Sequence, residues 1–411
     1  MSSYRSELMR VLESRGYIHQ TTDAEALDEA AANGIVPGYI GFDATAPSLH
    51  IGSLVQIMML RHLQRTGHKP IVVMGGGTTK IGDPSGKDTS RQMLDAEAIA
   101  SNIAGIRTVF ERLLTFGDGP TDAVLVDNAE WLDKLGYVEL LREVGPHFTV
   151  NRMLTFESVR RRLDREQPLT FLEFNYMILQ AYDFRELANR YDCRLQMGGS
   201  DQWGNIVSGM ELARRMDGKQ LFGLTTDLLT TADGAKMGKT AAGAVWLNED
   251  ALPNYDFWQY WRNVDDRDVG RFLKLFTDLP LDEITRFAAL EGAQINEAKI
   301  ALANAVTTLV RGEEAAKAAE TTAGQTFAGT GLGEDLPKLI IPFEGVRIGA
   351  ALTELGFVAS GREAKRKLAE GAVKIDGSVI ADPGYVIALE PGAEAQLSLG
   401  KKKHARLVPS A

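Results

Sequence analysis

The sequence predicts an α/β protein whose first half is a doubly wound parallel sheet, followed by a helical segment and a small mixed segment. Residues 70–77 form an apolar run that ends in three glycines, as buried parallel strands often do. Residues 39–43 form a shorter strand, and residues 50–66 between the two carry apolar side chains at helical spacing. Strand, helix and strand make one right-handed βαβ unit, and ligands bind beyond the carboxyl ends of such strands.

Length and composition set the class of protein. A chain of 411 residues predicts two or three domains, and 44% hydrophobic with 24% charged residues is ordinary for a globular protein. The charged N-terminus predicts no signal peptide, and no uncharged apolar run of about 18 residues predicts a membrane span. Cys193 is the only cysteine, which excludes an intrachain disulfide and a Cys-based zinc site. We therefore expect a cytoplasmic enzyme with no membrane partner.

The later part of the chain changes character twice. Residues 247–320 have helical periodicity, residues 321–334 are rich in Gly and Thr, and the segment from 344 starts helical and ends in short strands. The expected domains are 1–225 for the sheet, 226–320 for the helices, 321–343 for a flexible linker and 344–411 for the C-terminal domain.

His50 opens the helix expected at residues 50–66. Backbone N–H groups and the positive end of the helix dipole make such a terminus favourable for phosphate. A histidine there can donate a hydrogen bond as charge develops, and Gly52 lets a ligand approach the backbone. A capping or packed core histidine is the alternative, and one histidine does not decide between them.

The glycine-rich stretch GGGTTKIGDPSGK at residues 75–87 matches neither common nucleotide-binding loop. The P-loop pattern requires glycine where Ile81 stands, and the dinucleotide pattern requires glycine where Lys80 stands. Asp83 is therefore the candidate polar residue of this loop. An Asx turn ahead of Pro84 is its structural alternative.

Tyr176, Gln180 and Asp183 share one face of a helix expected at residues 176–184. A phenol, an amide and a carboxylate among apolar neighbours suit a small polar ligand in a largely dry pocket. Contact with another domain explains this face equally well.

Residues 196–205, QMGGSDQWGN, add glycines and polar groups at another strand end. Residues 236–240, KMGKT, place two lysines on a loop that could close on a polyphosphate or simply be solvated.

Together these segments resemble the class I aminoacyl-tRNA synthetases, and within them the bacterial tyrosyl-tRNA synthetases. Residues 50–53, HIGS, are similar to the H-I-G-H signature, and KMGKT is similar to K-M-S-K-S. GFDATAPSLHIG, IGDPSGK, YMILQAYDF and GGSDQWGN are further matches, and several ordered motifs are far more specific than one. The resemblance implies a Rossmann-like catalytic domain, an α-helical domain that contacts tRNA, and a small α+β S4-like domain.

The resemblance also implies a reaction. L-tyrosine and ATP form tyrosyl-adenylate and pyrophosphate, and the tyrosyl group then passes to the 3′ end of tRNA(Tyr). Mg²⁺ is expected to arrive with ATP, so no protein-held metal is expected. The residues implied for tyrosine binding are Tyr39, Asp83, Tyr176, Gln180, Asp183 and Gln202. Those implied for ATP binding are Gly41, Asp43, Gly52, Ser53, Gly199, Asp201 and Lys239. Those implied for catalysis are Thr45, His50, Lys236, Lys239 and Thr240, with Lys87 and Arg91 on a mobile loop over the pyrophosphate.

Two positions depart from the signatures. Ser53 replaces the second histidine of H-I-G-H and cannot carry charge, and Gly238 replaces the serine of K-M-S-K-S. Both lysines of the second signature remain. The departures affect how charge is stabilised in the transition state and leave the reaction class unchanged, because in-line displacement at phosphorus needs positioning and charge rather than a protein nucleophile.

The C-terminal segment resembles S4-type RNA-binding domains. Residues 341–411 carry 10 Lys and Arg against 8 Asp and Glu, whereas the whole chain has a net charge of −10. A basic group on one expected helix predicts tRNA contacts, although a solubilising surface is the alternative. Its members are Arg362, Lys365, Arg366 and Lys367. The resemblance further implies a homodimer through the catalytic domain, and we expect no DNA partner.

Three alternatives remain open from the sequence. A nucleotidyltransferase would share the H-x-G-H logic but would need neither the polar helix face at 176–184 nor an RNA-binding tail. A non-catalytic RNA-binding protein would not need four residues that the chain retains: His50, Asp183, Lys236 and Lys239. Tryptophan is a rival substrate, because Asp183 could also accept an indole N–H.

Overall fold

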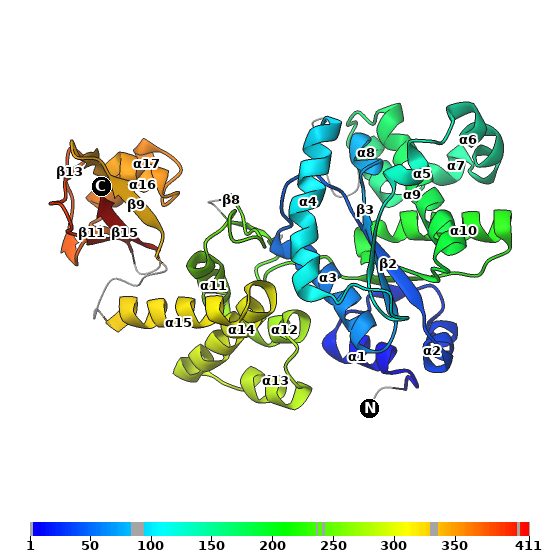
Figure 1. Ribbon diagram of the computed structural model, residues 1–411, viewed down its shortest axis with the longest axis horizontal. Coiled ribbons are helices and arrows are strands. Elements are labelled where there is room, and N and C mark those ends of the chain that lie inside the picture. The colour runs from blue at the N-terminus through cyan, green and yellow to red at the C-terminus, as the bar shows by residue number, and fades with distance from the viewer. Residues whose placement is uncertain are drawn as a thin grey trace. The chain divides into compact units, whose positions relative to one another are not determined.

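The computed structural model describes residues 3–83, 94–235, 237–240, 243–328, 336–400 and 403–410. The chain divides into two compact units, Met1–Thr230 and Thr231–Ala411 (Figure 1). No helix in the described ranges is both long and apolar enough to cross a membrane. Each unit is described separately below.

The first unit is built on a six-stranded sheet with the order β1-β6-β5-β2-β3-β4. Five strands are parallel and β1 is antiparallel to β6, which confirms the predicted parallel sheet. From β2 the chain winds through β3 to β4, and it returns on the other side of β2 to form β5 and β6. The switch point therefore lies between β2 and β5. The strands are β1 (Gln20–Thr21), β2 (Pro37–Phe42), β3 (Lys69–Met74), β4 (Val124–Asp127), β5 (Leu195–Gly199) and β6 (Phe222–Thr226).

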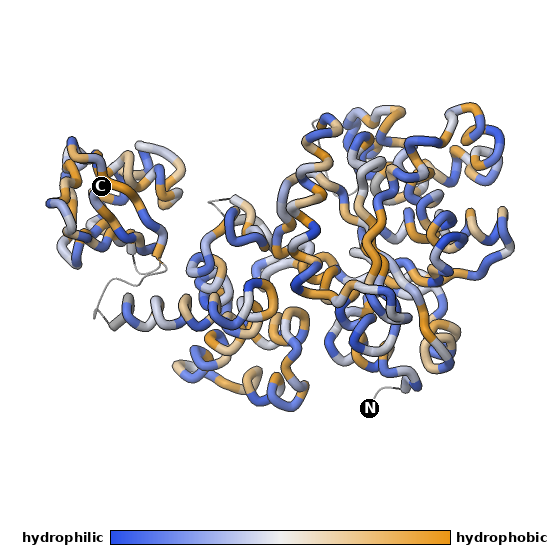
Figure 2. Tube along the Cα trace, in the orientation of Figure 1, coloured by the Kyte–Doolittle hydropathy of each residue, from blue (hydrophilic) through white to orange (hydrophobic). Residues whose placement is uncertain are grey.

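Helices cover this sheet, and the apolar run at β3 lies among them (Figures 1 and 2). The helices expected at 50–66 and 176–184 are confirmed within α3 and α9. A capping box between Thr170 and Glu173 starts α9, and Gly218, at φ 67°, ends α10. The helices are α1 (Glu7–Arg15), α2 (Ala24–Asn33), α3 (Ile51–Arg65), α4 (Ala96–Leu113), α5 (Ala129–Leu132), α6 (Tyr137–Glu143), α7 (Val150–Met153), α8 (Glu157–Asp164), α9 (Phe171–Arg190) and α10 (Trp203–Asp217).

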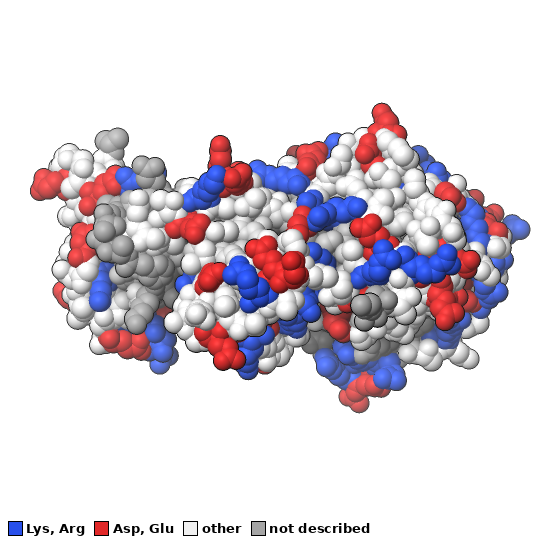
Figure 3. All heavy atoms as spheres, turned by 90° about the horizontal axis from the view of Figure 1, so that it is seen from below, with Lys and Arg blue, Asp and Glu red and all other residues white. Residues whose placement is uncertain are grey.

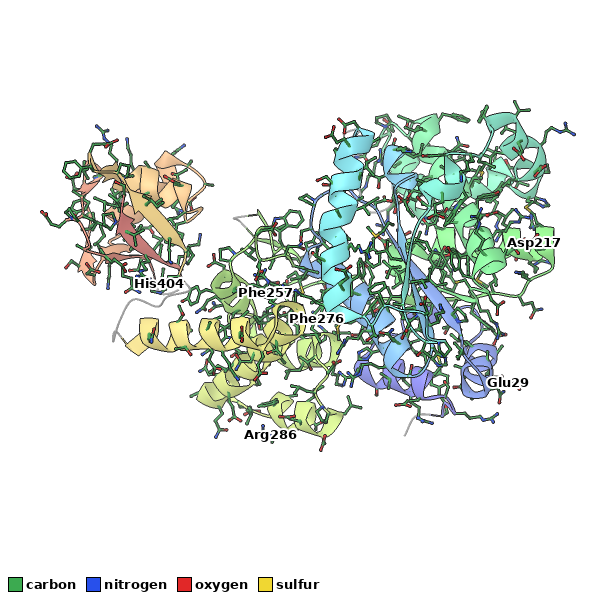
Figure 4. All side chains as sticks on the ribbon, in the orientation of Figure 1. Glu29, Asp217, Phe257, Phe276, Arg286 and His404 are labelled. Carbon is green, nitrogen blue, oxygen red and sulfur yellow. The ribbon has the colours of Figure 1, made fainter. Side chains whose placement is uncertain are left out.

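The second unit contains the helices expected from residue 247. An aromatic cluster holds them together: the Trp261 ring lies 6.1 Å from Phe272 and 5.0 Å from Phe276, measured between centroids. Phe257 joins the cluster at 6.3 Å from Trp261 (Figure 4). The helices are α11 (Asn254–Arg262), α12 (Asp266–Phe276), α13 (Leu281–Ala288), α14 (Ile295–Arg311) and α15 (Glu313–Ala328).

The predicted linker at 321–343 is wrong at both ends. Residues 321–328 continue α15. The burial of Thr322 and Ala323 stabilises the helix there, although the Gly and Thr content of this stretch disfavours helix formation. Residues 338–341 form β9 and pair in parallel with β15, so that Leu339 lies opposite Leu407. Residues 329–335 lie outside the described ranges.

The C-terminal segment has a hydrophobic core of its own, which runs from Leu339 to Leu407 in sequence. Its main sheet has the order β12-β11-β14-β15-β9, and β10 pairs with β13 separately. Helices followed by strands confirm the predicted pattern, while β9 was not expected. The elements are β9 (Lys338–Ile341), β10 (Val346–Arg347), α16 (Ile348–Glu354), α17 (Gly361–Ala369), β11 (Val373–Ile375), β12 (Ser378–Val379), β13 (Val386–Ile387), β14 (Ala395–Leu399) and β15 (Lys403–Pro409). Its assignment as a separate S4-like domain stays a prediction.

Candidate active site

The candidate site of the first unit lies at the carboxyl ends of β2, β3 and β5, beside the switch point, where open α/β sheets bind ligands. Asp43 and Thr45 follow β2, the glycine-rich stretch follows β3, and Asp201 and Gln202 follow β5. The polar face of α9 supplies Tyr176, Gln180 and Asp183. Residues far apart in the sequence therefore meet at one edge of the sheet.

Asp183 is a buried carboxylate held by two N–H donors. The Nδ2 of Asn128 donates to its Oδ2 at 2.9 Å, and the Nε1 of Trp131 donates to its Oδ1 at 2.7 Å. Burial raises the pKa of Asp183 to about 7, although both hydrogen bonds lower it. The carboxylate is thus fixed in orientation and lies in a largely dry environment.

Tyr39 lies on β2 with only 1% of its surface exposed, and its ring packs edge-on against Phe184 at 5.2 Å. Its pKa is well above the usual value, first because of burial and then because of the charge of Asp183, so its hydroxyl stays protonated. Among the described residues the Tyr39 Oη has no hydrogen-bond partner. A buried hydroxyl without a partner is costly, and a ligand hydroxyl beside Asp183 would satisfy it.

A cluster of amides and a carboxylate includes Gln180, which lies one turn before Asp183 on α9. The Nε2 of Gln202 donates to Asp83 Oδ2 at 2.9 Å, and the Nε2 of Gln180 donates to Gln202 Oε1 at 3.2 Å. The Nδ2 of Asn205 donates to Gln180 Oε1 at 2.8 Å. The structure thus brings Asp83, Gln180 and Gln202 together as the sequence predicted, and Tyr176 reaches Asp43 with its hydroxyl at 3.4 Å.

Asp43 and several glycines at the strand ends form another part of the site. The Thr78 hydroxyl donates to Asp43 Oδ1 at 3.0 Å. A Cβ at Gly75 would approach that same Oδ1 to 2.5 Å, and a Cβ at Gly199 would approach Asp201 Oδ1 to 2.8 Å. Side chains at these two positions would therefore displace the carboxylates. A Cβ at Gly41 would meet nothing within 4 Å, so the backbone there is open to a ligand.

His50 is the N-cap of α3, and its Nδ1 accepts the Gly52 N–H at 2.9 Å. The capping interpretation is therefore confirmed for Nδ1. Because Nδ1 is an acceptor, the proton of the neutral imidazole sits on Nε2, which makes Nε2 a donor. The Ser53 N–H bonds to the His50 carbonyl at 2.8 Å within the first turn of the helix.

The lysine-bearing loop belongs to the second unit. Lys239–Thr240 forms β7, which pairs antiparallel with β8 (Gly243–Ala244), and the Val245 N–H bonds to the Gly238 carbonyl at 3.1 Å. Gly238 has φ 104°, a conformation that explains glycine at this signature position. Lys236, Lys87 and Arg91 lie outside the described ranges.

Sequence reasoning missed the residues that support the site. Asn128 and Trp131 hold Asp183, and Asn205 holds Gln180. The Thr79 hydroxyl accepts the Ala44 N–H at 2.8 Å and so fixes the loop after β2. The sequence could have indicated Asn128 as a site residue, since it directly follows the apolar strand β4 at the carboxyl edge of the sheet. No comparable sequence feature indicated Trp131.

The basic residues expected at the C-terminus lie on α17 as predicted, but acidic neighbours offset their charge. The Lys367 Nζ lies 2.9 Å from Glu370, while Arg366 is 3.8 Å from Glu363 and 3.9 Å from Glu370. Arg362 and Lys365 are exposed and form no ion pair with a described residue. Figure 3 likewise shows positive and negative side chains interspersed over one face of the molecule.

Known proteins have similar sequences and a similar fold. The family of class I tRNA synthetases (W and Y) matches residues 34–328. The tyrosine–tRNA ligases of Novosphingobium aromaticivorans and Zymomonas mobilis are 68% and 60% identical over 404 residues, with 98% of each chain covered. A C-terminally truncated mitochondrial tyrosyl-tRNA synthetase from Aspergillus nidulans superposes with a TM-score of 0.71 at 27% identity, over 78% of this chain and 94% of that one. The family match, the 68% identity over nearly the full length of the chain and the shared fold together show the family. The chain belongs to the bacterial class I tyrosyl-tRNA synthetases.

Proposed function

We propose that the chain activates L-tyrosine with ATP to tyrosyl-adenylate and pyrophosphate, and then transfers tyrosine to the 3′ end of tRNA(Tyr). Family membership supports the reaction class. The observation that carries the choice of substrate is the pair formed by the buried Asp183 carboxylate and the Tyr39 hydroxyl, which has no partner among the described residues.

The pair recognises a phenol by its two hydrogen-bonding capacities. Asp183 accepts the phenol proton, and the Tyr39 hydroxyl donates to the phenol oxygen. Phenylalanine would fill the same space, but it would leave the Tyr39 hydroxyl without a partner and would offer Asp183 no hydroxyl proton. Tyrosyl-tRNA synthetases are the known example of this form of discrimination. Tryptophan could satisfy Asp183 through its indole N–H but offers no oxygen to Tyr39.

The other groups of the site hold the reacting end of tyrosine. Asp83, Gln180 and Tyr176 supply oxygens for the ammonium group, and Gln202 supplies an amide N–H for the carboxylate. A carboxylate oxygen of tyrosine attacks the α-phosphorus of ATP, and the bond from phosphorus to the pyrophosphate oxygen breaks. No protein nucleophile is needed, because holding both substrates in line supplies much of the rate.

Charge that develops on the phosphates is met by donors. The Nε2 proton of His50 and the N-terminus of α3 are assigned to this role, together with Thr45. The family signatures add Lys236, Lys239 and Thr240, and Lys87 and Arg91 for pyrophosphate. Gly41, Gly52, Ser53, Gly199 and Asp201 are assigned to the nucleotide. Mg²⁺ arrives with ATP and keeps most of its waters.

The decisive test is ATP–pyrophosphate exchange with each of the twenty amino acids and no tRNA. Exchange with tyrosine alone supports the proposal, and exchange with tryptophan instead would show that tryptophan is the substrate. Exchange with no amino acid would favour a nucleotidyltransferase or a non-catalytic RNA-binding protein. The cytoplasmic location expected from the sequence stays a prediction.

The C-terminal segment is proposed to bind tRNA through α17. Because β9 pairs with β15, we propose that this segment starts before residue 338 and that a truncation should end at residue 328 rather than at 343. The truncated protein should form adenylate at the normal rate and lose tRNA charging. Normal charging by this protein would contradict the RNA-binding role.

A homodimer is proposed through the first unit. Large apolar side chains are exposed along one stretch of its chain, including Phe171 at 68% and Val138 at 69%. The full set is Tyr137, Val138, Leu141, Val150, Leu154, Leu163, Phe171 and Leu172. Exposed apolar side chains in this number are typical of a contact surface. Light scattering should give twice the chain mass, and the double substitution V138E and F171E should give monomers.

A further inference from the structure

Thr78 occupies the first position of the 3₁₀ turn after β3, with 3% of its surface exposed. Its hydroxyl has two hydrogen bonds. It lies 3.0 Å from Asp43 Oδ1 and 3.1 Å from the Nδ2 of Asn128. An ionised carboxylate can only accept and an amide nitrogen can only donate, so Thr78 donates to Asp43 and accepts from Asn128.

The orientation of the Asn128 amide is set by the backbone. Its Oδ1 accepts the Gly77 N–H at 2.8 Å, and its Nδ2 therefore faces Thr78 and Asp183. A flipped amide would place N–H groups against the N–H of Gly77 and remove the donor from Asp183. The usual ambiguity between the two ends of an asparagine amide is thus resolved by the network.

These bonds form one directed chain from Asn128 through Thr78 to Asp43, and Asn128 also donates to Asp183. We propose that Thr78 is a positioning residue that couples the Asp183 carboxylate, at the phenol end of the site, to the Asp43 carboxylate, at the nucleotide end. The inference rests on the roles proposed above for Asp183 and Asp43. Neither the sequence motifs nor the family signatures assign this function to Thr78.

The local packing is built around this hydroxyl. A Cβ at Gly75 would approach Thr78 Oγ1 to 2.6 Å and Asp43 Oδ1 to 2.5 Å, so only glycine leaves room for the pair. Removing the hydroxyl would take one acceptor from the Asn128 amide and one donor from Asp43 in a buried place. Both carboxylates would then be less well oriented, and we expect losses at both ends of the site.

The test compares T78V, which removes the hydroxyl at nearly constant volume, with T78S, which keeps it. The matched control is T225V: Thr225 is fully buried on β6 of the same sheet, and its hydroxyl has no hydrogen-bond partner among the described residues. Full-length proteins are compared after active-site titration. The readouts are the pre-steady-state rate of tyrosyl-adenylate formation and the ratio of kcat/KM for tyrosine to that for phenylalanine in pyrophosphate exchange.

T78V should lower both the rate and the ratio by about 10-fold, the size expected when buried polar groups lose a hydrogen bond. T78S and T225V should stay within about 2-fold of the unmodified protein. If T78V is poorly folded, T78A is used instead, because it removes the same hydroxyl. T78A must then lower both the rate of adenylate formation and the tyrosine-to-phenylalanine ratio. A loss in T78V that T78S does not restore would indicate packing and would overturn the proposal.

D183N separates this inference from the proposed function. If D183N leaves the tyrosine-to-phenylalanine ratio unchanged, the phenol role of Asp183 is wrong, and the coupling falls with it. If D183N lowers the ratio while T78V behaves like T225V, the phenol role holds and the coupling through Thr78 alone is wrong.

Discussion

The residues proposed for phenol recognition all lie in the first compact unit, whereas those proposed for the polyphosphate come from both units. Asp183 is oriented by two N–H donors before any substrate binds, and its partners Asn128 and Trp131 are themselves buried. Lys239 of the second signature instead lies on a short hairpin of the second unit. The Asp183 carboxylate is therefore preorganised by packing, whereas Lys239, which is proposed for the polyphosphate, belongs to the other unit.

The largest effect should come from the phosphate end. H50A should lower the rate of adenylate formation by about 10² to 10³, the usual cost of losing one transition-state donor, and leave tyrosine affinity nearly unchanged. H50N retains a capping oxygen and a donor and should be less impaired. Stopped-flow kinetics at saturating ATP provide the measurement, and an unchanged rate would remove His50 from the proposed role.

The phenol end should respond in affinity and in selectivity. D183N should weaken tyrosine binding by about 1–3 kcal/mol, because it replaces the ionised acceptor in a buried site that supplies two N–H donors. Phenylalanine binding should change much less. Equilibrium dialysis with both amino acids measures the difference, and equal losses for both would show that Asp183 supports the fold rather than the phenol.

A pH titration probes the same carboxylate without mutation. The pKa of Asp183 is raised to about 7, so the folded protein binds more protons than the unfolded chain between about pH 4 and pH 7. The free energy of unfolding contributed by this group therefore falls as pH rises through that window. Tyrosine binding should change in the opposite direction, because the ionised form is the stronger acceptor.

Between pH 8 and pH 6 the preference for tyrosine over phenylalanine should fall by up to about 10-fold, in proportion to the ionised fraction of a group with a pKa near 7. Calorimetric titrations with both amino acids measure the preference at each pH. The phenylalanine titration is the control for changes elsewhere in the site. A preference that is flat across this range would place the pKa of Asp183 outside it.

The smallest effect should lie on the C-terminal helix α17. The double substitution R362A and K365A should leave pyrophosphate exchange unchanged and weaken tRNA binding several-fold. The slope of log affinity against log salt should become shallower by about 1 per lost phosphate contact. K367A is the matched control, since Lys367 is paired with Glu370. An unchanged slope would favour a solubilising role for these residues.

Several features followed from the sequence alone. The βαβ unit, α3 with His50 at its start, the polar face of α9 and the helical run after residue 247 were predicted and are confirmed. These features depend on periodicity and capping over short windows, and local sequence encodes both directly. The family resemblance implied tyrosine-binding roles for Asp83, Gln180 and Gln202, and the structure joins these three side chains by hydrogen bonds.

Only the tertiary structure decided the rest. Asn128 holds Asp183 across 55 residues of chain, Thr78 holds Asp43 across 35, and no periodicity records such partners. Likewise β9 exists because β15 lies beside it, and α15 extends past residue 321 because burial outweighs its weak helix formers. The sequence thus indicated which polar residues to expect at the site. Non-local hydrogen bonds, which form only once the sheet brings its strand ends together, determined how those residues are held.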